Sequence, residues 1–372
     1  MEPIRILQIV TYMGRGGLES MLMNYYRNID RSKVQFEFLV HRDFEADYDK
    51  EIISLGGRIF HVSRLVPWSH SYRAELKNFF HEHPEYQIVH VHQDCLSSVA
   101  LQCAKVCGIP VRCAHAHSSS AVKNLKYPIK LFYRHKIARY ATDLFACNQS
   151  SGDWMFCGAP FRIVKNAIDL EQYRFNAETA RRVRETLGLG DKFVVGHVGR
   201  FRTEKNHAFL VRVFASLLKK QPNAALLLVG DGDLEDTLKE QVQALGIQDH
   251  VQFLGARADV PQLMQAMDAF VFPSLYEGLP LTMIEAQAAG LPCIISDRVP
   301  NECIVTNLVT QQSLDVDPEA WVEEILKHQD ETRTDTSAEL CHAGFDIMDN
   351  AQKLQDFYLE QYKTNCEAVN NE

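Results

Sequence analysis

The sequence lacks several features that mark specialised classes of protein. Its ten cysteines include no Cys-x-x-Cys pair and no cysteine–histidine group at zinc-site spacing, so no structural zinc site is predicted. Apolar runs stay below the length of about 18 residues that a membrane-spanning helix needs. A net charge of −9 argues against a surface built to coat nucleic acid, and we predict no nucleic-acid partner.

The remaining composition is ordinary for a globular protein. Hydrophobic residues make up 46% and charged residues 23% of the 372 residues, a length that suggests two domains. Scattered thiols fit a reducing compartment, and the opening apolar run IRILQIV is too short for a signal peptide. We therefore expect a cytoplasmic protein, free or peripheral on the inner face of the cell membrane.

Short apolar segments recur at intervals that leave room for a helix between them. They include IRILQIV, QFEFLV, RIFHV, QIVHVH, VRCAHAH and DLFACN, and later KFVVGHVG, ALLLVG, HVQFLG, DAFVFPS and PCIISD. This alternation predicts an α/β protein with parallel sheets covered on both faces. A charged segment at 169–192 interrupts it. We expect two Rossmann-like doubly wound domains, 1–168 and 169–344, that face a central cleft at the carboxyl ends of their strands. A terminal helix, at about 345–364, could pack on either domain.

The first glycine-rich loop, TYMGRGGLES, follows the first predicted strand. Gly16 and Gly17 precede a helix, an arrangement that lets backbone N–H groups approach an anion. The dinucleotide fingerprint would need a glycine where Glu19 stands, so a dehydrogenase is the least favoured function. A plain tight turn explains this loop equally well.

Histidines end two strands of the first half. We expect His115 and His117 to point to opposite faces of their strand, so that one of them, His117 in preference to His115, faces the cleft. A structural, hydrogen-bonded histidine is somewhat more common at such a position. The three serines that follow favour a polar pocket edge, and His92 is a weaker candidate.

Cations crowd the loop VGRFRTEKNH in the second half. Arg200, Arg202 and Lys205 would suit a diphosphate, because a guanidinium binds in a fork and an ammonium acts as a point charge. The alternative is a solvated charge cluster.

A strand–loop–helix segment, PSLYEGLPLTMIEAQAAGLP, carries two acids. Pro280 suits the first turn of a helix that Gly290 ends, which places Glu277 on the loop and Glu285 inside the helix. Free N–H groups near the helix start attract phosphate, whereas a carboxylate there is useful only as an acceptor for hydroxyls. The combination predicts a nucleotide-sugar ligand.

These segments resemble retaining glycosyltransferase family four. The segment YEGLPLTMIEAQAAGLPCIISD matches its E-G-x-P-x-x-x-x-E-A motif, with seven residues between the two acids. GRGGLES, AHAHS, VKNAID, VGRFRTEKN, LVGDGDLED and VQFLGARADVPQLM follow in the family's order, over about residues 4 to 305.

The resemblance implies a GT-B fold whose last helix crosses back onto the first domain, and a transfer that needs no metal or other cofactor. The implied catalytic residues are His117, Arg200, Lys205 and Glu277. The implied donor-binding residues are Gly16, Gly17, Leu254, Gly255, Ala256, Gly278, Leu279, Pro280, Leu281 and Glu285. Arg200 and Lys205 would hold the diphosphate, Glu285 the ribose and Glu277 the donor sugar.

The function implied is a retaining hexosyl- or N-acetylhexosaminyltransferase. It would move a sugar from a nucleotide-sugar, preferably a UDP-sugar, to a glycan or lipid-linked acceptor in exopolysaccharide, capsule or other surface-glycan assembly. A GT-B nucleotide-sugar epimerase and a non-catalytic nucleotide-sugar-binding regulator are the alternatives.

A basic segment stands out in the acidic chain. No acid occurs between residues 118 and 142, and its cations are Lys123, Lys126, Lys130, Arg134, Lys136 and Arg139. Interleaved apolar residues predict an amphipathic helix at 123–140 that docks on an anionic membrane surface. The alternative is a solvated helix whose apolar side packs on the first domain.

Overall fold

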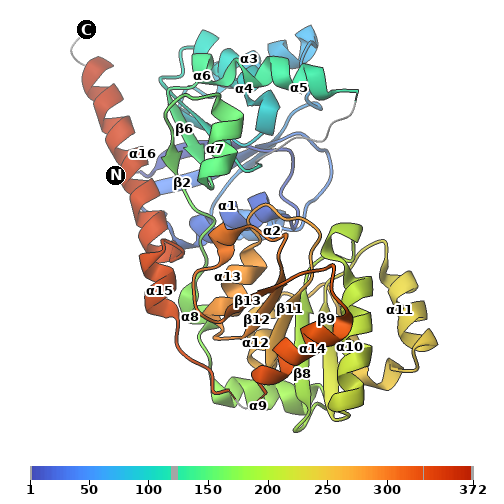
Figure 1. Cartoon of the computed structure of the whole chain (residues 1–372). Helices are drawn as coiled ribbons and strands as arrows, with labels where there is room; N and C mark the ends of the chain where they lie inside the picture. The colour runs from blue at the N-terminus through green and yellow to red at the C-terminus, as the bar shows by residue number, and fades with distance from the viewer. Residues whose placement is uncertain (1, 119–124, 330, 370–372) are drawn as a thin grey trace. The chain divides into compact units, whose positions relative to one another are not determined.

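A computed structural model describes residues 2–118, 125–329 and 331–369 (Figure 1). The chain divides into two compact units. One comprises Met1–Ala167 together with Ile347–Glu372, and the other comprises Ile168–Asp346. The sequence predicts boundaries at 168/169 and 344/345.

The first unit is built on a parallel sheet of seven strands, in the order β3-β2-β1-β4-β5-β6-β7. Its strands are β1 (Ile4–Ile9), β2 (Val34–Val40), β3 (Ile59–His61), β4 (Ile88–Val91), β5 (Val111–Ala116), β6 (Asp143–Ala146) and β7 (Arg162–Ile163). Its helices are α1 (Gly17–Asn28), α2 (Asp49–Ser54), α3 (His70–Glu82), α4 (Ser97–Val106), α5 (Tyr127–Arg134), α6 (Ile137–Tyr140), α7 (Gln149–Phe156) and α16 (Ile347–Val369).

Two hydrophobic clusters cover the two faces of this sheet. Helices α1 and α16 pack on one face, and helices α3 and α4 pack on the other. The terminal helix α16 belongs to this unit because its helically spaced apolar residues are buried there, as their spacing predicted: Ile347, Leu354, Phe357 and Tyr358. Each such side chain contributes about 1.5–3 kcal/mol when fully buried.

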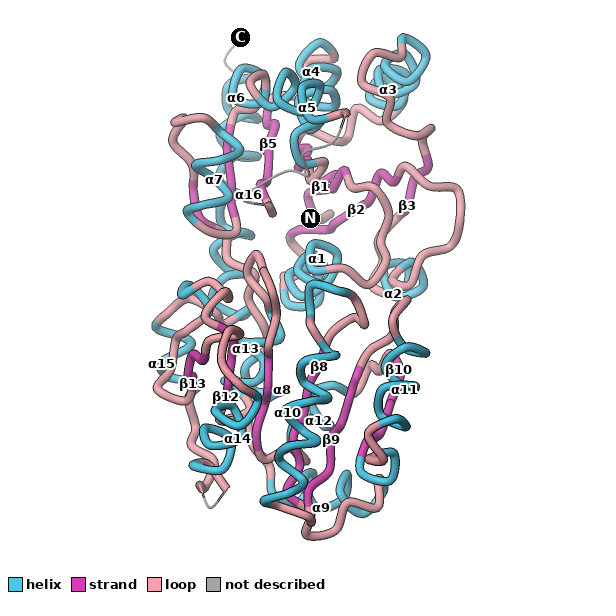
Figure 2. The backbone as a smooth tube through the Cα atoms, turned by 45° about the vertical axis from the view of Figure 1, so that its right-hand side comes forward, coloured by secondary structure: helices cyan, strands magenta, loops and turns pink. Residues whose placement is uncertain are grey.

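The second unit contains a parallel six-stranded sheet, in the order β10-β9-β8-β11-β12-β13. Its strands are β8 (Phe193–Val198), β9 (Ala224–Val229), β10 (Val251–Gly255), β11 (Ala269–Phe272), β12 (Cys293–Ser296) and β13 (Val309–Gln312). Its helices are α8 (Leu170–Tyr173), α9 (Ala177–Thr186), α10 (His207–Lys220), α11 (Glu235–Ala244), α12 (Val260–Gln265), α13 (Leu281–Ala288), α14 (Pro318–Lys327) and α15 (Ser337–His342). Helices lie on both sides of the strands (Figure 2).

Each sheet has one point where the strand order reverses. In the first unit it lies between β1 and β4, and in the second between β8 and β11. The loops that leave neighbouring strands at such a point run in opposite directions, which opens a crevice at their carboxyl ends. Ligand-binding residues are therefore expected in the loops after these four strands.

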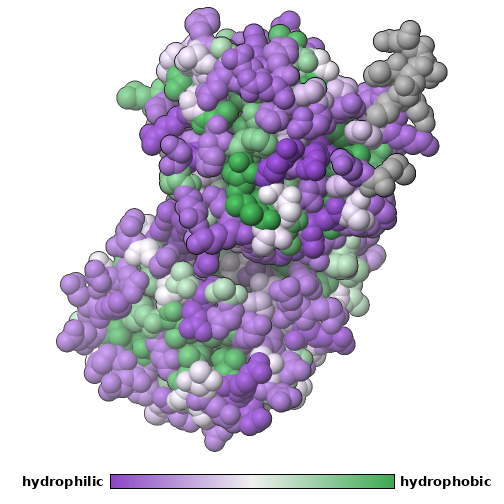
Figure 3. Space-filling model, turned by 180° about the vertical axis from the view of Figure 1, so that it is seen from behind, coloured by the Kyte–Doolittle hydropathy of each residue, from purple (hydrophilic) through white to green (hydrophobic). Residues whose placement is uncertain are grey.

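The surface agrees with the composition. The face shown in Figure 3 is mostly hydrophilic, with hydrophobic residues in small groups. Within the described ranges, no helix has the combination of length and hydropathy that a membrane span requires.

Candidate functional site

An ion pair joins the loops that follow β8 and β11 in the second unit. The Nζ atom of Lys205 lies 2.6 Å from Oε1 of Glu277. The two side chains are only 17% and 11% exposed, so water screens their attraction less than it would at an open surface. Two residues that the sequence assigned to catalysis are thus in direct contact, at the point where the strand order of this sheet reverses.

Two hydrogen bonds fix the two loops against each other. The Leu275 N–H donates to the Glu204 carbonyl at 2.8 Å, and the Asn206 side-chain amide donates to the Pro273 carbonyl at 3.2 Å. Asn206 adopts a left-handed conformation, with φ 54°, directly after Lys205. The Lys205 ammonium lies 4.8 Å from the ring centroid of Phe272, the last residue of β11. Lys205 is therefore held on a rigid support.

Two glycines let a neighbouring loop approach this support closely. Gly230 and Gly232 follow β9 with φ of +142° and +151°, a region that side chains rarely adopt. A Cβ atom on Gly230 would overlap the Gly199 carbonyl, and one on Gly232 would lie 2.6 Å from the Phe201 carbonyl. The Phe201 N–H donates to Asp231 at 2.6 Å. The glycines of LVGDGD thus allow the cationic loop to pack tightly, a role that sequence reasoning did not assign to them.

Helix α13 begins beside the ion pair. Pro280 is its N-cap, so the helix begins after Pro280 and does not include it in the first turn as predicted. No side chain caps this end of the helix. The first N–H groups of the helix are therefore left for other acceptors, and the helix dipole favours an anion there. Gly290, with φ +66°, ends the helix as predicted.

Glu285 lies within α13, half-buried, on the fifth residue of the helix. Burial raises the pKa of this carboxyl to about 7, and a hydrogen bond with Tyr173 of α8 acts in the opposite direction. Tyr173 was missed from the sequence, because its segment carries no motif. A carboxylate held in a poorly solvated position gains from any hydroxyl that donates to it.

The remaining second-unit residues assigned from the resemblance lie at the same edge of the sheet. Arg200 is exposed on the loop after β8, Leu254 and Gly255 end β10, and Ala256 follows it. The Gly255 carbonyl already accepts a hydrogen bond from Gly230 N–H at 2.8 Å.

The glycines of the first unit begin helix α1. Gly16 is the N-cap and Gly17 the first helical residue. The carboxylate of Glu19, in the first turn, lies so close above Gly16 that a Cβ atom there would collide with it. An acidic side chain thus already complements the positive end of the helix dipole. A phosphate bound at Gly16 and Gly17 would have to displace it, and their donor-binding role stays a prediction.

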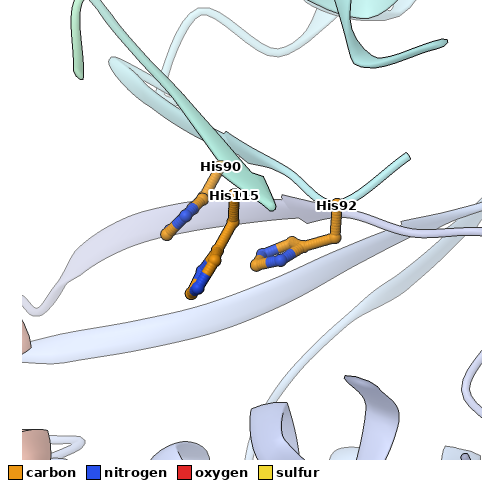
Figure 4. A group of neighbouring side chains, drawn as sticks. All are labelled: His90, His92 and His115. Atoms are coloured by element: carbon orange, nitrogen blue, oxygen red, sulfur yellow. The ribbon is translucent and has the colours of Figure 1, made fainter. Parts of the chain in front are cut away.

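The histidines were assigned to the wrong faces. His115 and His117 point to the same side, with ring centroids 4.2 Å apart and planes inclined by 26°. Side chains alternate from one residue to the next in a strand, so residues two apart share a face. His90, His92 and His115 also point the same way (Figure 4). His117 follows β5 at its carboxyl end, half-buried.

Burial keeps this histidine group neutral. It lowers the pKa of His90 and of His117 to about 3 and holds the pKa values of His92 and His115 well below the usual range. Nitrogen atoms of His90, His92 and His115 lie within 4.8 Å of one another, a spacing that could attract a metal ion. Both nitrogens of His92 are, however, already engaged in hydrogen bonds, so this ring is not free to act as a ligand.

The basic segment forms two short helices where one was predicted. The helix is interrupted at residues 135–136, which connect α5 to α6. Arg134 turns inward, with its guanidinium 5.0 Å from the ring centroid of Trp154, whereas Lys126 and Phe132 are exposed. Lys123 lies outside the described residues. The cations of this segment thus do not all face solvent: Arg134 packs on the protein, and Lys126 is exposed.

Comparisons with known proteins decide the family. A family model described as Glycosyltransferase Family 4 matches residues 15–172, and one described as Glycosyl transferases group 1 matches residues 180–339. The putative glycosyltransferase EpsF of Bacillus subtilis (strain 168) is 35% identical over 368 residues, which are 95% of this chain and 96% of that protein. This chain belongs to glycosyltransferase family four. The family and the fold identify it as a glycosyltransferase, as the sequence motifs indicated.

One further relative and two solved structures are also similar to this glycosyltransferase. The Escherichia coli UDP-Gal:alpha-D-GlcNAc-diphosphoundecaprenol alpha-1,3-galactosyltransferase is 26% identical, over 74% of this chain and 76% of that protein. Among solved structures, Anabaena HepE in complex with UDP has a TM-score of 0.79 at 20% identity and covers 96% of this chain and 100% of that one. Sucrose-phosphate synthase from Thermosynechococcus elongatus has a TM-score of 0.74 at 17% identity, over 97% and 99% of the two chains. The predicted GT-B fold is confirmed.

Proposed function

We propose that this glycosyltransferase transfers a hexosyl or N-acetylhexosaminyl group from a UDP-sugar to an acceptor hydroxyl, with retention of the anomeric configuration. The observation that carries the proposal is the Lys205–Glu277 pair beside the uncapped start of α13. It combines a cation and helix N–H groups suited to a diphosphate with a carboxylate suited to sugar hydroxyls.

The chemistry follows from where charge develops. When the bond between the sugar and the diphosphate breaks, negative charge accumulates on the leaving phosphate oxygens. Lys205, Arg200 and the first N–H groups of α13 would stabilise this charge, with Lys205 released from Glu277 once sugar hydroxyls occupy that carboxylate. These groups would do the work that a metal ion does in other transferases, so we propose that the transfer is metal-independent. Glu277 would accept hydrogen bonds from the donor sugar, and Glu285 from the ribose.

The choice of donor and pathway is supported by the relatives. The name of the E. coli relative specifies UDP-galactose and a diphosphoundecaprenol-linked acceptor, and HepE was solved with UDP. EpsF and a Salmonella typhi protein named for Vi polysaccharide biosynthesis are also similar. We therefore propose a role in cell-surface polysaccharide assembly, with a lipid-linked acceptor at the inner face of the cell membrane.

The test compares UDP-sugars with and without a polyprenyl-diphosphate-linked sugar as acceptor, using NMR to identify the anomeric configuration of the product. Transfer with retention, unaffected by a chelator, is expected. Conversion of the donor without acceptor would indicate an epimerase, and an inverted product would contradict the mechanism.

Variants at the cations provide the second arm of this test. Each charge-assisted contact to the leaving group contributes about 1.5–3 kcal/mol, which corresponds to a loss in kcat of about 10- to 150-fold. Lys205→Ala and Arg200→Ala should show this loss, while Lys219→Ala, an exposed lysine on α10, should not. Normal turnover in both site variants would end the assignment.

A further inference from the structure

A chain of hydrogen bonds crosses three adjacent strands of the first unit. The Gln8 side chain belongs to β1, His92 follows β4, and His117 follows β5, and these strands are neighbours in the sheet. His92 Nε2 lies 2.9 Å from the amide oxygen Oε1 of Gln8, and His92 Nδ1 lies 2.9 Å from His117 Nε2. The chain thus leads from a fully buried amide to a strand end where a ligand is expected.

Each imidazole in this chain of hydrogen bonds is neutral and has a single N–H group. Burial holds the pKa values of His92 and His117 far below neutrality, and the charges that neighbouring histidines would carry lower the pKa of His92 further. A neutral imidazole has one N–H donor and one nitrogen with a lone pair. The position of that one hydrogen is therefore decided by hydrogen-bond partners, as it is in other histidine sites.

The partners set the order of donors along the chain. The Gln8 oxygen can only accept, so His92 must carry its hydrogen on Nε2 and use Nδ1 as an acceptor. His117 must then donate from Nε2. Its Nδ1 keeps a lone pair and has no hydrogen-bond partner among the described residues.

We propose that Gln8 and His92 are positioning residues that hold His117 in the Nε2–H form, so that its Nδ1 accepts a hydrogen bond from a hydroxyl of the bound sugar. The proposal rests on the proposed function, since it assumes that a sugar lies beside His117. His90 has a different partner, because its Nδ1 is hydrogen-bonded to the hydroxyl of Tyr358 at 2.6 Å.

The tautomer can be observed directly without substrate. In protein labelled with ¹⁵N-histidine, two-bond ¹H–¹⁵N correlations distinguish Nε2–H from Nδ1–H imidazoles, and His117→Asn identifies the signals of residue 117. We expect the Nε2–H form in the wild type. In Gln8→Leu, His92 loses the acceptor for its Nε2 hydrogen, so the chain is free to reverse and His117 should populate the Nδ1–H form.

Two substitutions of His92 provide a matched pair. His92→Asn can place its amide oxygen near the former Nδ1 position and should keep His117 in the Nε2–H form. His92→Phe removes the acceptor with a ring of similar size and should release it. In steady-state kinetics, kcat should fall about tenfold in Gln8→Leu and in His92→Phe, with little change in KM for the acceptor. His92→Asn should keep a kcat close to that of the wild type.

The outcomes separate the two claims. Two results would overturn the proposed relay, the hydrogen-bond chain Gln8–His92–His117. One is an Nδ1–H or charged His117 in the folded wild type, and the other is a His117 tautomer that none of the variants changes. A wild type that shows the expected tautomers but transfers no sugar from any donor would leave the relay intact and contradict the proposed function.

Discussion

Lys205 and Glu277 form a 2.6 Å ion pair that connects the two loops at the strand-order reversal of the second sheet. The pair holds a cation where a leaving diphosphate would need it, and it also partly neutralises that cation. A carboxylate so close to a bound phosphate repels it unless sugar hydroxyls occupy the carboxylate. The two residues therefore have opposing effects on the binding of UDP alone.

The first prediction follows from this opposition. Glu277→Gln removes the negative charge beside Lys205, so the affinity for UDP, which has no sugar, should rise by about threefold to tenfold, while kcat for the UDP-sugar should fall by at least about tenfold. Calorimetry with UDP and steady-state kinetics measure the two effects. A matched control, Glu323→Gln, removes a carboxylate from a surface pair with Lys220 and should change neither quantity.

The second prediction concerns the pH dependence of stability. Burial raises the pKa of Glu285 from 4.5 to about 7 in the folded protein. Between these values the unfolded chain has lost the proton and the folded protein still holds it, so this group makes stability fall as pH rises from about 4.5 to about 7. The full loss is ~3 kcal/mol, and less if water reaches the carboxyl.

Urea unfolding of the wild type and of Glu285→Gln at a series of pH values measures this effect. The difference between the two free energies of unfolding should change across pH 4.5–7 and be constant above it. Parallel curves would show that the folded-state pKa is not raised. The affinity for a UDP-sugar should also fall as the pH decreases through 7, because ribose hydroxyls donate better to the ionised carboxylate.

The third prediction compares two glycines with positive φ. Gly188 has φ +64° with no atom within 4 Å of a Cβ, so Gly188→Ala should cost about 1 kcal/mol of stability. In Gly230→Ala the new Cβ would in addition overlap the Gly199 carbonyl, so the cost should exceed ~2 kcal/mol. Only the second substitution should also lower kcat, since it displaces the loop that carries Lys205. Equal effects on unfolding would contradict the close approach.

The fourth prediction concerns the basic segment. We expect the protein to co-sediment with vesicles rich in phosphatidylglycerol at low salt and to be released at high salt, because each exposed cation contributes roughly 1 kcal/mol near such a surface. Reversal of the exposed cations, in Lys126→Glu with Arg139→Glu, should abolish binding, whereas Lys219→Glu with Lys220→Glu on α10 should not. Failure of the wild type to bind at low salt would remove the membrane proposal.

Much of the fold could be predicted, because short apolar segments mark the strands and helical spacing marks the terminal helix. All eleven predicted strands are present, and Ile347, Leu354, Phe357 and Tyr358 are buried as their spacing required. Two strands were missed. β7 has two residues, both exposed, and β13 is polar, so their pairing depends on neighbouring strands and not on their own sequence.

The site could be predicted only as far as its motifs reach. The spacing of Glu277 and Glu285, and the cations after β8, pointed to the region now seen around α13. The partners that support it, such as Tyr173, carry no local signal because they come from other segments. The histidine relay could have been found, since VHVH and HAH end adjacent strands and residues two apart share a face.

The most direct test of the account is a crystal structure of the protein with a UDP-sugar. We predict that the diphosphate contacts Lys205 and the first N–H groups of α13, that the ribose hydroxyls donate to Glu285, and that the sugar replaces Lys205 as the partner of Glu277. A nucleotide bound away from the loop after β8 and the start of α13 would contradict the account.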